Sequence, residues 1–324
     1  MGESALHRGS PHRAHCGGRC LLSIRQPPSI TGGVLVAVGA ILLAAKGLFA
    51  KSLYEMGLSF HDVAAIRSVL AVPGFALLAW LYRSRSAPDL VITRRDIGLA
   101  IFAGILCYYL GALANFYALT IIDASVERPL LFAYPIFVVL IKMVIERKAP
   151  SPRVILALIL TSLGVLLVTG ALNTTLTDSE WIGMGWILFC SVSIAIYFLI
   201  SGDLTQRLGS GLFTLIAMGS AAAGLAGHYQ WVAGWQHIDL SATAWYTLSA
   251  LIVFSTVLPL FLMAEGVRRI GPSRASLIST LGPPATALMA YELTGEVLAA
   301  AQWLGIALVI VGVLALEMGR SRPG

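Results

Sequence analysis

The chain has 324 residues, of which 57% are hydrophobic and only 12% are charged. An average soluble domain has about 25% charged residues, so this composition excludes an ordinary soluble globule. Apolar runs of about 20 residues recur from end to end, which is typical of helices that cross a lipid bilayer. The net charge of +6 does not indicate nucleic-acid binding, because the basic residues recur at the ends of the apolar runs instead of gathering in one patch.

Residues 1–29 form a polar tail that has no continuous apolar core, so we expect a disordered cytoplasmic segment and no cleavable signal peptide. Cys16 and Cys20 lie there beside two histidines. No second cysteine pair accompanies them, and no nearby fold would fix the geometry of a metal site. Cys107 and Cys190 fall inside apolar runs and are expected to pack as small hydrophobes. We therefore predict neither a metal nor a cofactor.

After the tail, the sequence predicts ten transmembrane helices. Each apolar segment is long enough to cross a hydrocarbon layer of about 30 Å as a helix. The connections are too short to hold a soluble domain, so we expect an all-α integral membrane bundle. The segments are 30–52, 61–82, 97–119, 124–145, 152–171, 182–201, 211–234, 244–265, 272–292 and 299–318.

Lysines and arginines set the expected orientation. With the N-terminus in the cytoplasm, 17 of the 22 basic residues fall on cytoplasmic segments. The loops near Asn173–Trp181 and Gln230–Thr243, which would then lie outside, contain none. An excess of Lys and Arg on the cytoplasmic side is the general rule, so we expect both termini in the cytoplasm.

The chain also repeats itself. At a shift of 148 residues Ile122 meets Ile270 and Pro135 meets Pro283, and at a shift of 152 Gly57 meets Gly209. The unit holds five crossings, and because five is odd the second copy enters the membrane upside down. Inverted repeats are typical of secondary transporters, although duplication also yields static bundles. The predicted division is a tail over 1–29, a first repeat over 30–171, a second repeat over 182–318 and a tail over 319–324.

Several short motifs recur in a particular order along the two repeats. They are Ala45-Lys46-Gly47 with Lys51, Tyr54 and Gly57, then Arg67, the run from Ala124 to Pro135, Phe254 to Pro259, Ile278 to Pro283, and Glu296 with Gln302, Gly305 and Gly312-Val313.

Together these motifs resemble the EamA family of the drug/metabolite transporter superfamily, over nearly the whole chain after residue 30. The resemblance implies two EamA repeats of five helices each and carriage of a small metabolite across a bacterial inner membrane. It does not identify the cargo. One departure concerns the acids: Pro283 and Glu296 are 13 residues apart, whereas Pro135 and Glu146 are 11 apart, so Glu146 is not given the role of its counterpart.

Four ionisable groups fall in one layer of the predicted bundle. At 1.5 Å per residue, Lys46 and Arg67 come out roughly 6–7 Å to the outer side of the midplane, and Glu127 and Arg128 about 9–10 Å. Charges at such depth are costly and mark pathways or paired sites. Three cations against one carboxylate leave a surplus that an anionic ligand would relieve, so we expect a cargo that carries a carboxylate or another acidic group.

Structural alternatives remain for two of these groups. Glu127 could stabilise a helix N-terminus, and Arg128 could extend its charge to the outer interface. Tyr134 lies near the midplane beside Pro135, where we expect it to line a cavity because a buried hydroxyl needs a partner. The expected substrate-binding residues are Lys46, Arg67, Glu127, Arg128, Tyr109 and Tyr134, and the expected helix-bend residues are Pro135, Pro283 and Pro284.

The leading hypothesis is a secondary carrier in which the two repeats rock about a central site. No Walker loop is present, so the cargo gradient would supply the energy, with proton coupling through Glu127 as an option. A membrane-embedded enzyme is disfavoured, since no catalytic cluster is apparent. A sensor or scaffold without transport activity stays open. The expected partners are a small-molecule substrate and the lipid bilayer, and a homodimer is left open.

Overall fold

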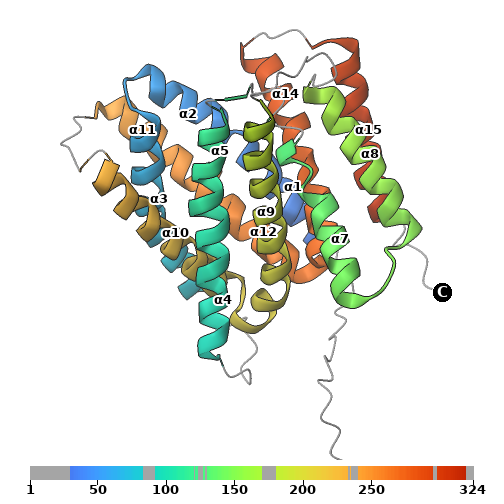
Figure 1. The fold of residues 1–324 in the computed structure, drawn as a ribbon. Coiled ribbons are helices and arrows are strands. Elements are labelled where there is room, and N and C mark those ends of the chain that lie inside the picture. Colours follow the sequence, from blue (N-terminus) through green and yellow to red (C-terminus); the bar gives the residue numbers. More distant parts are fainter. Residues whose placement is uncertain are drawn as a thin grey trace, which may run out of the picture.

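The computed structural model is helical throughout the part of the chain that it describes (Figure 1). The described residues are 30–82, 92–119, 121–122, 127, 130–169, 180–232, 234, 240–294 and 298–318. Both predicted tails, Arg128 and Glu296 lie outside these residues.

The first repeat contributes a broken leading helix and four further helical passages. Its elements are α1 (Ile30–Ala44), α2 (Lys46–Glu55), α3 (Phe60–Leu81), α4 (Arg94–Gly104), the π-helix η2 (Ile105–Leu110), α5 (Gly111–Leu119), α7 (Tyr134–Glu146) and α8 (Pro152–Thr169).

The second repeat follows the same plan. Its elements are α9 (Glu180–Leu208), α10 (Ser210–Val232), α11 (Ala242–Ile252), the π-helix η4 (Val253–Val257), α12 (Leu258–Ile270), α13 (Pro272–Ile278), the short 3₁₀-helix η5 (Ser279–Leu281), α14 (Gly282–Thr294) and α15 (Ala300–Met318).

Six helices of the described chain are long and apolar enough to cross a membrane. They cover His61–Leu81, Arg94–Asn115, Pro152–Thr169, Trp181–Leu208, Ser210–Val232 and Ala242–Ile270. Two shorter apolar helices, Thr31–Ala44 and Ala300–Leu316, accompany them. The expected all-helical membrane bundle is confirmed at this level, and the total of ten crossings stays a prediction.

Corresponding elements of the two repeats begin at matching positions. The starts of α4 and α11, of α7 and α14, and of α8 and α15 are each separated by the predicted 148 residues. The two π-helices are separated by the same interval, since η2 begins at Ile105 and η4 at Val253. Gly57 and Gly209, which match at 152, both turn the chain at positive φ, 93° and 77°. Only glycine adopts such φ values at little cost.

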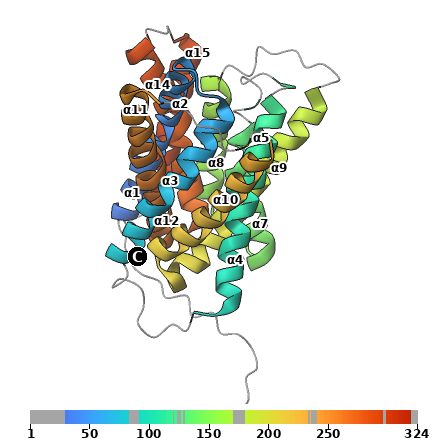
Figure 2. The ribbon, with the colours of Figure 1, turned by 90° about the vertical axis from the view of Figure 1, so that its left-hand side faces the viewer.

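Many helix ends meet at one end of the bundle. Gly32 near the start of α1 lies against the end of α12, and Leu316 near the end of α15 lines a pocket with Arg153 and Arg274. The described chain therefore enters and leaves the bundle at the same end (Figures 1 and 2). We call this the arginine-rich end. Its described basic residues are Arg94, Arg95, Arg147, Lys148, Arg153, Arg207, Arg268, Arg269 and Arg274.

Helices α8 and α15 lie side by side at the edge of the bundle (Figure 1). A Cβ placed on Gly305 would lie 2.7 Å from the carbonyl oxygen of Gly164, and one on Gly164 would lie 2.7 Å from that of Gly305. Small residues allow such backbone approach between membrane helices, where the hydrophobic effect offers little force for association. Gly312 belongs to the same contact, because a Cβ placed on it would lie 2.9 Å from Cγ2 of Thr161.

Two segments that the sequence predicts as unbroken transmembrane helices are interrupted in the structure. The first is interrupted at Ala45 between α1 and α2, and Ser255 of η4 donates a 2.9 Å hydrogen bond to the carbonyl of Leu42 beside this break. In the fourth, Pro135 was expected to bend a helix in its middle, but it occupies the first turn of α7. Proline is tolerated there because first-turn N–H groups lack helical partners in any case.

The Gly164–Gly305 contact predicts a steric effect. Gly305→Ala should destabilise the protein by about 1–3 kcal/mol, the usual cost of overpacking, because backbone atoms stand where the new methyl must go. Thermal unfolding of the detergent-purified protein measures it. Gly185→Ala on α9 is the matched control, since a Cβ there meets nothing within 4 Å. An equal loss of stability in both variants would contradict this account.

Candidate functional site

Three charged residues from the predicted layer come close together in the structure. Lys46 opens α2 directly after the break in the first helix. Its ammonium group lies within electrostatic range of both Arg67 on α3 and Glu127. The three residues differ in exposure to solvent. Lys46 is exposed, Arg67 is half-buried and Glu127 is 6% exposed. We refer to Lys46, Arg67 and Glu127 as the charged cluster.

Arg67 lies between the two π-helices. Its Nη1 donates a 3.3 Å hydrogen bond to Oγ1 of Thr256 in η4, and the guanidinium is within electrostatic range of Tyr108 in η2. Tyr108 and Thr256 are equivalent positions of the two repeats, 148 residues apart. A π-turn inserts one residue into a helix and is often found at functional sites. Arg67 therefore lies where the two repeats meet, beside equivalent positions of both.

Thr256 itself is fixed by the π-turn. Its hydroxyl donates to the carbonyl of Leu251, five residues earlier, at 3.1 Å, so its oxygen lone pair can accept from Arg67. The spacing of apolar residues gave no sign of this contact, because a single threonine inside an apolar run carries no periodic signal.

Glu127 is held by an amide from a neighbouring helix. Nδ2 of Asn115, on α5, donates a 2.7 Å hydrogen bond to Oε1 of Glu127. A buried carboxylate needs such donors, since desolvation of an unpaired charge costs several kcal/mol, on the order of 3–5 when a partner is removed. The contact with Glu127 gives Asn115 a definite role.

Tyr134 lies deeper in the bundle and joins the two repeats. Its hydroxyl forms a short hydrogen bond with Oγ of Ser279 in η5, and its ring stacks on Phe198 with centroids 5.5 Å apart. Ser279 in turn donates to the carbonyl of Ser276 at 2.8 Å.

Tyr109 faces away from these contacts. Its ring packs edge-on to His228 with centroids 6.1 Å apart and lies against Gly224 of α10. Pro283 and Pro284 lie in the first turn of α14, directly after η5. The 3₁₀-helix and the prolines together interrupt the passage from α13 to α14 at the expected position.

The arginine-rich end contains a buried acid, Glu265, that sequence reasoning missed. Glu265 on α12 is 5% exposed. It forms salt bridges with Arg268 at 2.6 Å and Arg269 at 2.7 Å, and it accepts a 2.5 Å hydrogen bond from Ser210 at the start of α10. The signal was available, since a Glu three and four residues before two arginines is a standard helical ion-pair spacing.

A second, small cavity lies within the core of the bundle. Its volume is about 20 Å³, and its lining includes Tyr108, Tyr197, Phe198, Ser201, Leu260 and Met263. That volume suffices for about one water molecule. Within the described residues, no group of three or more His, Cys, Asp or Glu side chains is placed to hold a metal ion.

The sequence matches the model of the EamA-like transporter family twice, over residues 30–170 and 181–318. The chain belongs to the EamA-like transporter family. The two matched ranges agree with the predicted repeats, and each contains one of the two π-helices.

Curated relatives of this EamA-like protein include three described as transporters. "Uncharacterized transporter YcbK" from Bacillus subtilis is 33% identical over 90% of this chain and 95% of the relative. An "Uncharacterized transporter" from Archaeoglobus fulgidus is 23% identical over 87% of this chain and 95% of its own length. "Uncharacterized inner membrane transporter YicL" from Salmonella typhimurium is 22% identical, over 90% and 96% respectively.

The fold is also similar to that of a solved crystal structure. The superposition has a TM-score of 0.72 and covers 90% of this chain and 97% of the other, at 14% sequence identity. The arrangement of helices is thus shared by a chain of very different sequence.

The Glu127–Asn115 hydrogen bond predicts energetic coupling. Asn115→Leu should destabilise the protein by about 1–3 kcal/mol because it leaves a buried acceptor short of a donor. In a Glu127→Leu background the same change should cost less, with a coupling energy of about 0.5–3 kcal/mol. Chemical or thermal unfolding of the four variants gives this cycle. The control cycle combines Asn115→Leu with Glu146→Leu, at an exposed acid on α7, and its two free-energy losses should add. If the losses also add in the cycle with Glu127→Leu, the coupling is refuted.

Proposed function

We propose that this protein is a secondary transporter that moves a small, carboxylate-bearing or otherwise anionic metabolite across the bacterial inner membrane by alternating access. The observation that carries the proposal is the charged cluster, in which Arg67 bonds one repeat's π-helix and lies in range of the other's. Membership of a transporter family and the transporter names of the relatives support the general class. The anionic cargo and the coupling are our inference from the site.

The charge balance of the cluster favours an anion. Lys46 lies in electrostatic range of a second cation, Arg67, and of one described acid, Glu127, which also receives the amide of Asn115. A guanidinium has five N–H donors in a planar fork, and Thr256 accepts from one of them. A carboxylate that reaches the remaining donors would neutralise part of the surplus and gain charge-assisted, bidentate hydrogen bonds. Arg128, next to Glu127 in sequence, belongs to the same proposal.

The chemistry is asymmetric within a symmetric scaffold. At the 148-residue shift Glu127 corresponds to Ala275 and Asn115 to Met263, and at the 152-residue shift Arg67 corresponds to Gly219. The ionisable groups therefore come from the first repeat, while the second repeat supplies hydroxyls such as those of Thr256 and Ser279. This division supports a single central site at which one half moves against the other.

Accessibility favours an outward-facing state. Lys46 and Tyr54 are exposed residues of α2 within electrostatic range of Arg67, and α2 lies at the end of the bundle opposite the arginine-rich end (Figure 1). Towards that end lies the 20 Å³ cavity, and the hydrogen bond from Ser210 to Glu265 ties α10 to α12. The positive-inside rule orients the arginine-rich end, and with it both termini, to the cytoplasm. Binding from outside would precede opening at the Glu265 contacts.

Transport measurements test the anionic cargo directly. In proteoliposomes, uptake or exchange is measured against a panel of organic acids, amino acids and nucleotide precursors. We expect free acids to be carried and their methyl esters not to compete, since the ester has lost the charge that Arg67 recognises. Arg67→Gln should lower uptake roughly tenfold to a hundredfold, as expected for losing hydrogen bonds to a charged group.

The control for that variant is Lys142→Gln, which removes a charge from a surface pair with Glu146. It should transport like the unaltered protein. Equal inhibition by acids and esters would end the anionic part of the proposal. If no compound on the panel is carried, a sensor or scaffold role would be favoured instead.

A proton-coupling role predicts a separation of two activities. Glu127→Gln keeps the shape and one acceptor for Asn115 but cannot bind and release a proton. We expect it to retain substrate exchange at equal pH on both sides while losing accumulation driven by an imposed pH gradient. Glu146→Gln, at an exposed acid, should retain both. Gradient-driven accumulation that survives in Glu127→Gln would exclude this residue as the coupling group.

A further inference from the structure

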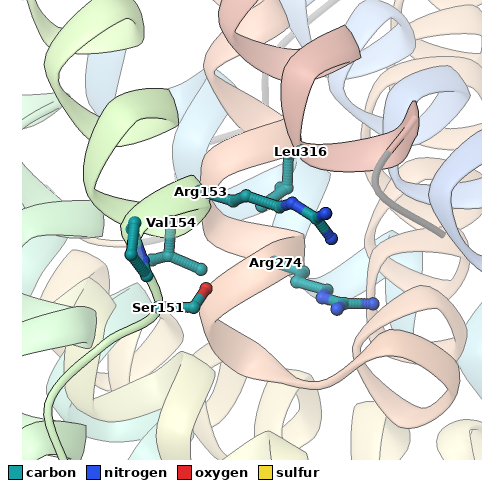
Figure 3. Close-up of a pocket in the computed structure, with 6 residues that line it drawn as sticks. Ser151, Arg153, Val154, Arg274 and Leu316 are labelled. Atoms are coloured by element: carbon teal, nitrogen blue, oxygen red, sulfur yellow. The ribbon is translucent and has the colours of Figure 1, made fainter. Parts of the chain in front are cut away.

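A further cavity lies at the arginine-rich end, and no residue of the charged cluster lines it. It has a volume of about 430 Å³ and lies where α8, α13 and α15 meet. Figure 3 shows its lining, which consists of Ser151, Pro152, Arg153, Val154, Arg274 and Leu316. Neither the transport mechanism nor the family match assigns a role to this pocket, which we call the basic pocket.

The described lining of the basic pocket is strongly positive. Two of its six residues are arginines, and the other four are uncharged. Figure 3 shows the side chains of Arg153 and Arg274 running in the same direction, with their guanidinium groups on one side. Guanidinium groups suit phosphate because their planar forks bond its oxygens in pairs.

Helix α8 adds to this potential. It begins at Pro152, within the pocket lining, and runs for 18 residues. The N-terminal end of a helix carries a partial positive charge that favours an anion nearby. The arginines come from two different helices, so their positive charges converge on one place only in the folded protein.

The other half of the lining is apolar, and the pocket borders a lipid-facing surface. Val154 and Leu316 form part of the wall. Further along α8 and α15, large apolar side chains are exposed, as expected where helices face acyl chains. They are Ile155, Ile159, Leu163, Ile310, Val311 and Leu314.

This combination distinguishes a lipid from a soluble anion. The pocket lies at the ends of two apolar helices, which is the level of the membrane–water boundary. A free phosphate would use the arginines only. A phospholipid would place its phosphate at the arginines and its acyl chains along the exposed apolar side chains, so it satisfies both halves of the site. Basic pockets between helices on the cytoplasmic side are known as binding sites for anionic headgroups.

We propose that Arg153 and Arg274 bind the phosphate of an anionic phospholipid from the cytoplasmic leaflet in the basic pocket. Arg274 lies five residues before Ser279, the partner of Tyr134. A lipid that holds Arg274 therefore restrains the short helix that leads into the substrate region. The lipid site stands independently of the proposed cargo, since its residues do not belong to the charged cluster.

The test is lipid binding by the purified full-length chain, measured by native mass spectrometry and by thermal shift. Phosphatidylglycerol is titrated against phosphatidylcholine, with inorganic phosphate and glycerol 3-phosphate as soluble competitors. We expect retention of phosphatidylglycerol in preference to phosphatidylcholine. Arg153→Gln with Arg274→Gln should weaken phosphatidylglycerol binding roughly thirtyfold, the combined contribution of two basic side chains near anionic lipid.

The matched control is Arg95→Gln with Lys148→Gln, which removes the same charge from exposed positions at the same end. It should bind phosphatidylglycerol like the unaltered chain. Equal weakening in both double variants would reduce the effect to general charge and overturn the site. Competition by the soluble phosphates at equal concentration would identify a soluble-anion site instead of a lipid site.

The proposal can still be tested if the double glutamine variant does not fold. If the double glutamine variant does not fold, Arg274→Lys replaces it, because lysine keeps the charge but loses the bidentate fork. We expect it to bind phosphatidylglycerol more weakly than the unaltered chain and more tightly than phosphatidylcholine. A lack of preference for the anionic lipid in the unaltered chain would overturn the proposal without any variant. None of these results depends on whether a substrate is carried.

Discussion

The low polarity of a bundle interior requires every buried carboxylate to have donors around it, and this requirement organises the structure. Glu265 and Glu127 meet it in different ways. Glu265 is neutralised at short range by two arginines of its own helix, and the hydrogen bond that it accepts from Ser210 ties α10 to α12 at the arginine-rich end. Glu127 receives the amide of Asn115 and lies in range of Lys46. The first arrangement is a closed ion-pair network, whereas the second leaves a positive surplus on which the proposed anion site rests.

Interrupted helices bring the polar groups of the site together. The break at Ala45 brings Lys46 to the start of a helix, and the two π-helices direct Tyr108 and Thr256 toward Arg67. Irregular backbone is tolerated at membrane depth only where protein or a polar cavity satisfies its hydrogen bonds. Ser255 does this for the carbonyl of Leu42. The break in the first repeat is thus supported by a side chain from the second repeat.

The two repeats share the same arrangement of helices, but the charged residues of the site occur in only one of them. Element starts agree at the 148-residue interval, and a chain of 14% identity shares the fold. The charged residues have small or apolar counterparts instead. A duplicated scaffold gives two related halves that can exchange conformations, while an unduplicated set of charges gives one site. The basic pocket follows the same pattern, since Arg153 corresponds to Ala301.

The sequence by itself determined the membrane character, the two repeats and the identity of the charged residues, because long apolar runs, a fixed interval and a charge in an apolar segment are all local signals. It did not reveal the break at Ala45, the paired π-helices or the position of Pro135 at a helix start, since each depends on which neighbour satisfies the backbone. The sequence did not reveal the hydrogen-bond partners of Arg67, Glu127 and Tyr134 either. Thr256 lies 189 residues from Arg67, and Ser279 lies 145 residues from Tyr134. Only tertiary structure decides such pairs, because hydrogen bonds depend on distance in space and the chain reaches those distances only after the two repeats pack.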